Sequence, residues 1–128
     1  MTPFDDNVGI PVKLSLTMSR SAGLDVVEVF GELDVYTAPL LREKLALALA
    51  EATAGVIVDL DGVDFMDSTG LGLLIGAHRR AVLAGGVLRI VCSRPEILRT
   101  LRISGLDQVL VVERSLAAAL AALGQPVA

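Results

Sequence analysis

The residues best suited to chemistry lie between positions 58 and 75, where an apolar run leads through four aspartates into a pattern typical of a helix. Ser68 follows the fourth aspartate and stands at the predicted helix start. Backbone N–H groups point outward at such a start and the helix dipole is positive, so a phosphate on the hydroxyl would be stabilised. We therefore interpret the segment as a switch site modified at Ser68, in a collar formed by Asp59, Asp61, Asp64 and Asp67.

Asp59 and Asp61 also match the Asp-x-Asp-Gly opening of haloacid dehalogenase-type phosphohydrolases, which follows an apolar strand. In that chemistry the first aspartate attacks phosphorus and the second acts as acid and base. The reaction also needs a basic side chain to neutralise the phosphoryl group and further acids to hold magnesium. The only lysines, Lys13 and Lys44, lie upstream, and the acids beyond Ser68 are isolated along the chain. A phosphohydrolase is therefore a remote alternative.

The spacing of the candidate residues also argues against other kinds of catalytic site. Residues 66–70 contain half of a nucleophile elbow, but methionine replaces its leading glycine. The only histidine, His78, lies ten residues along the same predicted helix, about 15 Å from Ser68, too far to take its proton. No histidine, cysteine or acidic residues have the spacing of metal ligands. We predict no catalytic residue, no cofactor and no metal, and expect no enzymatic activity.

The helix predicted after Ser68 contains three glycines, Gly70, Gly72 and Gly76. They resemble a dinucleotide-binding fingerprint, but the third comes one position late and no acid lies about twenty residues downstream. We expect them instead to let the helix pack closely against a sheet. The apolar face of this helix is predicted from the spacing i, i+3, i+4, i+7 and i+11, which selects Leu71, Leu74, Ile75, His78 and Val82.

The composition predicts one soluble domain. The chain has 128 residues, 53% of them apolar and 20% charged, yet no apolar run approaches the ~20 residues of a membrane span. The N-terminus lacks the features of a secretory signal, and a single cysteine, Cys92, fits a reducing cytoplasm. A net charge of −4 with few aromatic residues is unlike a nucleic-acid-binding protein. We expect a cytoplasmic protein whose partners include neither nucleic acid nor membrane.

Strand and helix patterns alternate along the chain, as in an α/β domain with crossover helices. A polar turn joins the first two strands into a hairpin, and the predicted strands are 12–18, 25–31, 56–60, 88–92 and 109–112. Helices are predicted from 37 to about 54 and at 68–84, 95–103 and 115–123. The order β-β-α-β-α-β-α-β-α predicts a mixed, mostly parallel sheet of about five strands. We expect one domain over residues 11–123, with a mobile lead at 1–10 and a mobile tail at 124–128.

The segment around Ser68 resembles a known family. Its sequence, Phe65-Met-Asp-Ser-Thr-Gly-Leu-Gly72, is similar to the phosphorylation-site signature of the STAS-domain anti-sigma factor antagonists, also called anti-anti-sigma factors. The resemblance extends to Phe30-Gly-Glu-Leu-Asp34, to the Gly85-Gly86 break and to Ile103-Ser-Gly-Leu106. It covers roughly residues 11–123 and implies a single STAS domain.

The resemblance implies a bacterial cytoplasmic protein that binds an anti-sigma factor and so releases a sigma factor to start transcription. In that family the anti-sigma factor is itself a serine kinase of the histidine-kinase-like ATPase fold. It phosphorylates the serine after the Asp, here Ser68, and a metal-dependent serine phosphatase removes the phosphate. Thr69 replaces a serine common in relatives and is a second candidate acceptor. The residues expected to touch the partner are Glu32, Asp34, Asp64, Asp67, Thr69, Gly70 and Leu71.

The switch also has a physical rationale that does not depend on the family. A phosphoserine adds about −1.5 to −2 charges beside Asp67, close to Asp64 and Asp34. Where a partner offers carboxylates or tight apolar contact, like charges at that place cost several kcal/mol and weaken binding without refolding. The alternative is a STAS scaffold, or an accessory subunit of a lipid-transport or stress-signalling assembly, in which Ser68 is only a helix cap.

Overall fold

In the part of the chain that the structure describes, five strands form one mixed sheet whose spatial order follows the chain, β1-β2-β3-β4-β5. The computed structural model describes residues 13–21, 23–51 and 54–123. β1 pairs antiparallel with β2, and every other neighbouring pair is parallel, which confirms the predicted mixed, mostly parallel sheet. The strands are β1 (Leu14–Ser21), β2 (Leu24–Leu33), β3 (Gly55–Met66), β4 (Leu88–Val91) and β5 (Val111–Glu113).

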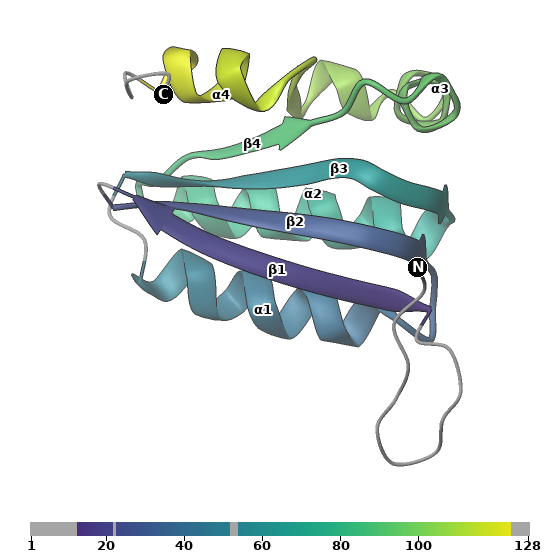
Figure 1. Cartoon of the computed structure of the whole chain (residues 1–128), viewed down its shortest axis with the longest axis horizontal. Helices are drawn as coiled ribbons and strands as arrows, with labels where there is room; N and C mark the ends of the chain where they lie inside the picture. Colours follow the sequence, from purple (N-terminus) through teal and green to yellow (C-terminus); the bar gives the residue numbers. More distant parts are fainter. Residues whose placement is uncertain (1–12, 22, 52–53, 124–128) are drawn as a thin grey trace.

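Helices connect the parallel strands and cover the sheet. In Figure 1, α1 lies below β1 and α2 lies behind β2 and β3, whereas α3 and α4 lie above β4. None of the helices in the described ranges is both long and apolar enough to cross a bilayer. Their bounds are α1 (Ala38–Glu51), α2 (Ser68–Leu83), α3 (Pro95–Ile103) and α4 (Leu116–Ala122), with a short 3₁₀ helix, η1 (Leu106–Gln108), before β5.

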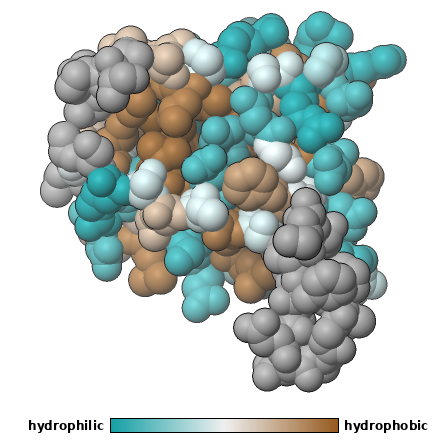
Figure 2. Space-filling view, viewed as in Figure 1, coloured by the Kyte–Doolittle hydropathy of each residue, from teal (hydrophilic) through white to brown (hydrophobic). Residues whose placement is uncertain are grey.

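Apolar side chains fill both sides of the sheet. In β3, Val58 and Leu60 enter the larger core beneath α1 and α2, whereas Ile57 enters a smaller core beside α4. Successive side chains of a strand point to opposite faces, so the continuous apolar run of β3 is buried on both sides, as predicted. Figure 2 shows a continuous hydrophobic patch at the upper left, between α4 and the strands. Leu40 and Leu47 of α1 line a separate groove of about 370 Å³.

β3 is much longer than predicted. It continues to Met66, whereas the sequence predicts a strand that ends at residue 60. Glycine and aspartates after residue 60 are typical of a loop, but their backbone stays paired with β2 through two register shifts. Gly62 makes this pairing feasible, because a Cβ there would lie 2.8 Å from the Val29 carbonyl oxygen and would overlap the Phe30 ring. The strand therefore carries the chain to the start of α2 without an intervening loop.

The buried face of α2 differs from the predicted one. Leu74 is buried as expected, but Leu71, Ile75 and His78 are only half-buried, and Val82 is 59% exposed. Small residues occupy positions that the search for large apolar side chains passed over, and they let the helix lie close to the sheet. The buried residues of α2 are Gly70, Leu73, Leu74, Ala77 and Ala81.

Only Gly70 of the three α2 glycines packs closely, as expected. A Cβ at Gly70 would lie 2.8 Å from Met66 Cγ and 2.9 Å from Leu33 Cγ. At Gly72 and Gly76 nothing lies within 4 Å of the Cβ position, so the expectation of close packing at these two is wrong. Both point away from the face that α2 buries.

The remaining differences lie at element ends. β1 runs to Ser21 rather than residue 18, because its polar residues belong to an edge strand that is open to solvent on one side. β5 begins at Val111 rather than residue 109, since η1 occupies part of the preceding connection. The predicted mobile lead at 1–10 and tail at 124–128 lie outside the described residues, as does residue 12, the predicted start of the first strand.

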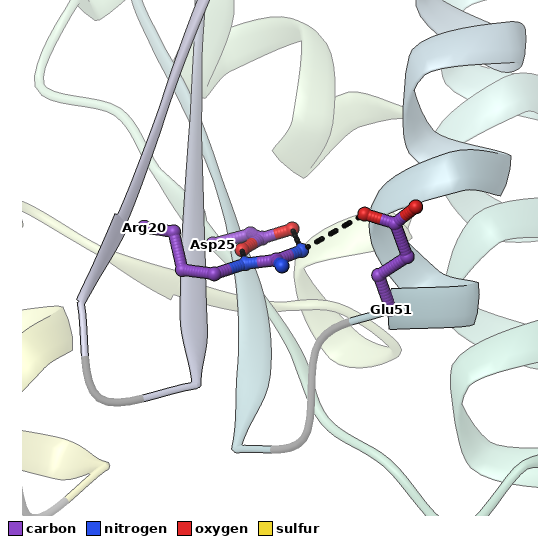
Figure 3. A network of polar contacts seen from close by, with 3 residues as sticks. All are labelled: Arg20, Asp25 and Glu51. Atoms are coloured by element: carbon purple, nitrogen blue, oxygen red, sulfur yellow. Dashed lines mark hydrogen bonds and ion pairs between the residues drawn. The ribbon is translucent and has the colours of Figure 1, made fainter.

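A charged cluster lies at the end of the sheet opposite the start of α2. Arg20 donates from Nη2 to Asp25 Oδ2 at 2.9 Å and to Glu51 Oε2 at 3.3 Å, and from Nε to Asp25 Oδ1. Figure 3 shows the guanidinium lying between the two carboxylates. Asp25 is fully buried, and a buried carboxylate is tolerated only when it is paired. The hydrogen bonds to Asp25 raise the pKa of Arg20, and the cluster joins the β1-β2 hairpin to the end of α1.

The packing of α2 can be tested with two glycine substitutions. Gly70→Ala should lower the free energy of unfolding by about 1–3 kcal/mol, because the methyl group enters space already filled by Leu33 and Met66. Gly72→Ala should raise it by about 0.5–1 kcal/mol, because alanine favours a helix and the position is open. Urea unfolding followed by circular dichroism measures both. If both substitutions changed the free energy of unfolding in the same direction, the assignment of Gly70 to the buried face of α2 and of Gly72 to its open face would be contradicted.

Candidate functional site

The end of the β2-β3 pair brings two distant segments together. Glu32 pairs in register with Phe65, and Leu33 with Met66. One residue further on, the Asp67 N–H donates to the Leu33 carbonyl at 3.2 Å. Residues 34–37, which lead into α1, therefore leave the sheet beside residues 67–70, which open α2. Ser68 lies at this junction.

Asp67 is the N-cap of α2. Its backbone is extended, with φ −101° and ψ −171°, and its Oδ1 accepts hydrogen bonds from Thr69 N at 2.9 Å and Gly70 N at 3.2 Å. Such a cap satisfies N–H groups that the helix itself leaves unpaired. The carboxylate of Asp67 is therefore committed to its own helix.

Ser68 is the first residue of α2 and is exposed. Its hydroxyl makes no hydrogen bond to any other residue in the described part of the chain. The cap role that the scaffold alternative gives to Ser68 is wrong, because Asp67 is the N-cap of α2. Thr69 is half-buried, so the two neighbouring hydroxyls differ in their access to solvent.

Asp34 organises the second segment. Its Oδ1 accepts hydrogen bonds from Tyr36 N at 2.9 Å and Thr37 N at 3.0 Å, and the Thr37 hydroxyl donates to the Glu32 carbonyl at 2.8 Å. Partial burial opposes ionisation of Asp34, but the hydrogen bonds from Thr37 and Tyr36 and the charge of Lys13 outweigh it and lower its pKa. The carboxylate is ionised at neutral pH and directed at its own loop.

Two of the four aspartates in the collar contact the chain about thirty residues later. Arg94 forms an ion pair with Asp64 at 3.1 Å. Asp61 Oδ1 accepts from Ser93 N at 2.6 Å and from Ser93 Oγ at 3.0 Å. The spacing within the sequence gives no sign of these contacts, because Ser93 and Arg94 reach the collar only through the pairing of β3 with β4. Of these two partners only Arg94 is charged, so it offsets the charge of Asp64, whereas Ser93 fixes the direction of the Asp61 carboxylate without neutralising it.

Asp59 lies on the other stretch of β3, away from Ser68. Its burial, and then the charges of Asp61 and Glu28, raise its pKa, although Asp61 N donates a hydrogen bond to it. A hollow of about 50 Å³ beside it is lined by Glu28, Phe30 and Asp61, with no lysine or arginine. A phosphate ester there would meet three carboxylates. Across the described residues, no group of three or more His, Cys, Asp or Glu side chains is placed to hold a metal ion.

The other predicted contact residues differ in accessibility. Glu32 is the penultimate residue of β2 rather than a loop residue, and it is half-buried. Leu71 is also half-buried. Gly70 is buried beneath Leu33 and Met66, so its role within the chain is to let α2 approach β2. That these residues touch a partner stays a prediction.

Comparisons with known proteins agree with this geometry. A family model of the STAS domain matches residues 15–119. The anti-sigma-B factor antagonist of Bacillus subtilis is 40% identical over 84 residues, which cover 66% of this chain and 76% of that protein. The Staphylococcus aureus protein of the same name is 40% identical over 86 residues, which cover 67% and 80%. The crystal structure of an anti-sigma factor antagonist from Mycobacterium paratuberculosis superposes with a TM-score of 0.80 at 28% identity, covering 88% and 95%.

The architecture is a sheet in chain order with crossover helices and a capped helix directly after the third strand, and the chain belongs to the STAS domain family. Its 40% identical relatives within that family are anti-sigma-B factor antagonists. The resemblance found in the sequence is confirmed.

Removing the helix cap should weaken the fold without removing Ser68. Asp67→Ala should lower the free energy of unfolding by about 1 kcal/mol, because two N–H groups lose their acceptor. Asp67→Asn keeps an acceptor oxygen and should retain most of the stability. Urea unfolding of the two variants separates the effect of losing the capping hydrogen bonds from the effect of losing the negative charge. Equal stability of both variants and the wild type would contradict the capping role.

Asp59 should make the fold less stable at neutral pH. Its folded-state pKa is raised above the ordinary value of 3.8, so ionisation favours the unfolded chain above that pH. Asp59→Asn should therefore raise the melting temperature at pH 7, and the gain should shrink as the pH falls below the unfolded-state pKa. Thermal unfolding between pH 3 and pH 7 measures this, with the exposed Asp107→Asn as control. A lower melting temperature for Asp59→Asn than for the wild type at pH 7 would refute the prediction that ionised Asp59 destabilises the fold.

Proposed function

We propose that this chain is an anti-sigma factor antagonist that acts in the bacterial cytoplasm by binding an anti-sigma factor and releasing its sigma factor. The proposal is supported by the names of the relatives that are 40% identical. It assigns no reaction to the chain itself. The acidic hollow beside Asp59 supports this view, because it would repel the substrates of the phosphohydrolase alternative.

The observation that carries the proposal is the state of Ser68. Its hydroxyl is exposed at the start of α2, and Asp67 caps the helix in its place. A hydroxyl that makes no hydrogen bond within the described residues, at a helix start that stabilises anions, is suited to reversible phosphorylation. We assign the modification to Ser68 rather than Thr69, because Thr69 is half-buried.

The finer proposal concerns the enzymes that act on Ser68. The anti-sigma factor is the serine kinase that modifies it, and a serine phosphatase restores it. The partner contacts the junction through Glu32, Asp34, Asp64, Asp67, Thr69 and Leu71, with Gly70 holding α2 in place beneath them. Asp34 and Asp67 contribute mainly by shaping their loops, since their carboxylates already accept hydrogen bonds from their own backbone.

Charge and packing energies favour a switch that blocks docking directly. The helix start stabilises an added phosphate by roughly 0.3–1 kcal/mol, so the free fold should change little. A phosphate held against a partner's carboxylates or apolar surface costs several kcal/mol, and ~3 kcal/mol already lowers affinity more than a hundredfold. Phosphorylation therefore prevents binding without unfolding the antagonist.

Substitutions of Ser68 test this switch. Ser68→Ala should bind the anti-sigma factor as tightly as the wild type, whereas Ser68→Glu should bind about tenfold more weakly or worse, because a charge is added at the docking surface. Both variants should melt within a few degrees of the wild type. Titration calorimetry and thermal unfolding give the two readouts. A large loss of stability in Ser68→Glu would indicate a conformational switch instead.

The scaffold alternative differs in its covalent chemistry. The purified chain is incubated with the anti-sigma factor kinase and ATP, and the phosphorylated residue is located by mass spectrometry. Phosphate at residue 68, absent from Ser68→Ala and retained in Thr69→Ala, supports the proposal. An unmodified chain supports a scaffold, and phosphate confined to residue 69 would move the switch to Thr69.

A further inference from the structure

The loop before α1 exposes two large apolar side chains. Tyr36 is 82% exposed and Val35 57% exposed, although large apolar side chains are normally buried. Tyrosine is among the residues most enriched at the energetic centres of protein interfaces. The ring also lies near a positive charge, with Lys13 Nζ 5.9 Å from its centroid. Within the described ranges, no contact that the fold requires explains this exposure.

The loop that carries Tyr36 is held in one conformation. The backbone N–H of Tyr36 donates to Asp34 Oδ1, and Thr37 connects Asp34 to the end of β2 through its own hydroxyl. A side chain presented from an ordered loop loses less conformational entropy on binding than one from a mobile segment. The hydrogen bonds of Asp34 therefore preorganise Tyr36 for contact with another molecule.

Tyr36 also lies at the junction that contains Ser68. Its segment follows Leu33, and α2 follows Met66, which is the register partner of Leu33. The hydrogen bond from Asp67 N to the Leu33 carbonyl joins the two chain segments at that level. A partner that covers Ser68 therefore meets the Val35-Tyr36 loop at the same end of the sheet.

From these observations we infer that Tyr36 is the main apolar anchor for the anti-sigma factor, with Asp34 as the positioning residue that holds it. The inference rests on the proposed function, since the partner is the same anti-sigma factor. That partner should offer an apolar recess for the ring and Val35. A phosphate on Ser68 would then be pressed against a surface already committed to apolar contact.

Truncation of the ring tests the anchor. Tyr36→Ala should weaken binding to the purified anti-sigma factor by at least about 30-fold, the loss typical of an interface hot spot, with an unchanged melting temperature. Tyr36→Phe keeps the ring and should lose far less. The matched control is Leu83→Ala, because Leu83 is 88% exposed at the far end of α2. Titration calorimetry with the full chain gives the affinities.

Asp34 variants test the positioning role. Asp34→Ala should weaken binding because the Tyr36 loop loses its acceptor, and Asp34→Asn should restore most of the affinity because an amide oxygen can take the same hydrogen bonds. Equal weakening by both variants would show that Asp34 contributes its charge instead.

The outcomes separate the inference from the proposed function. If the wild type binds, Ser68→Glu does not, and Tyr36→Ala binds like the wild type, then the anchor is refuted while the switch stands. If Leu83→Ala weakens binding as much as Tyr36→Ala, the effect is not specific to the loop and the anchor is also refuted. If the wild type fails to bind the anti-sigma factor at all, both proposals fall.

Discussion

The parallel pairing of β2 with the whole of β3 is the constraint on which the site depends. It continues through two register shifts to Leu33 and Met66, and a backbone hydrogen bond from Asp67 extends it by one residue. Gly62 permits this, since any side chain there would collide with the Val29 carbonyl and the Phe30 ring. Without the pairing of Leu33 with Met66, the loop before α1 and the start of α2 would leave the sheet at unrelated positions. The two segments could not then form one surface.

The electrostatics of the site differ from a simple acidic collar. Asp34 and Asp67 accept hydrogen bonds from their own loops, and Asp61 and Asp64 are tied to Ser93 and Arg94. The hydrogen bonds hold the carboxylates in fixed directions and favour their ionised form, and Arg94 offsets the charge of Asp64. A phosphate added to Ser68 therefore changes the local charge more, in proportion, than it would in a fully uncompensated acidic cluster. This makes a single modification an effective signal.

Much of the architecture follows from local sequence patterns. The order of strands and helices, the buried character of Val56–Leu60 and the helix start at Ser68 were all predictable, because they depend on periodicity and on capping residues within a few positions. The length of β3 was not, because glycine and aspartates favour a loop until a neighbouring strand supplies hydrogen bonds. The buried face of α2 was predicted only at Gly70 and Leu74; Ala77 and Ala81 were missed, since they are buried by their small size rather than by their hydrophobicity.

The functional site also has some features that the sequence predicts and others that only the tertiary structure decides. The sequence by itself determined that a hydroxyl follows an aspartate at a helix start, and its resemblance to a family assigned that hydroxyl a role. Only the tertiary structure decided that Arg94 pairs with Asp64, that Asp67 rather than Ser68 caps the helix, and that Tyr36 is exposed at the same end of the sheet as the serine. The physical reason is range: a cap acts over three residues, whereas Arg94 and Asp64 are thirty residues apart and meet only because β3 and β4 pair.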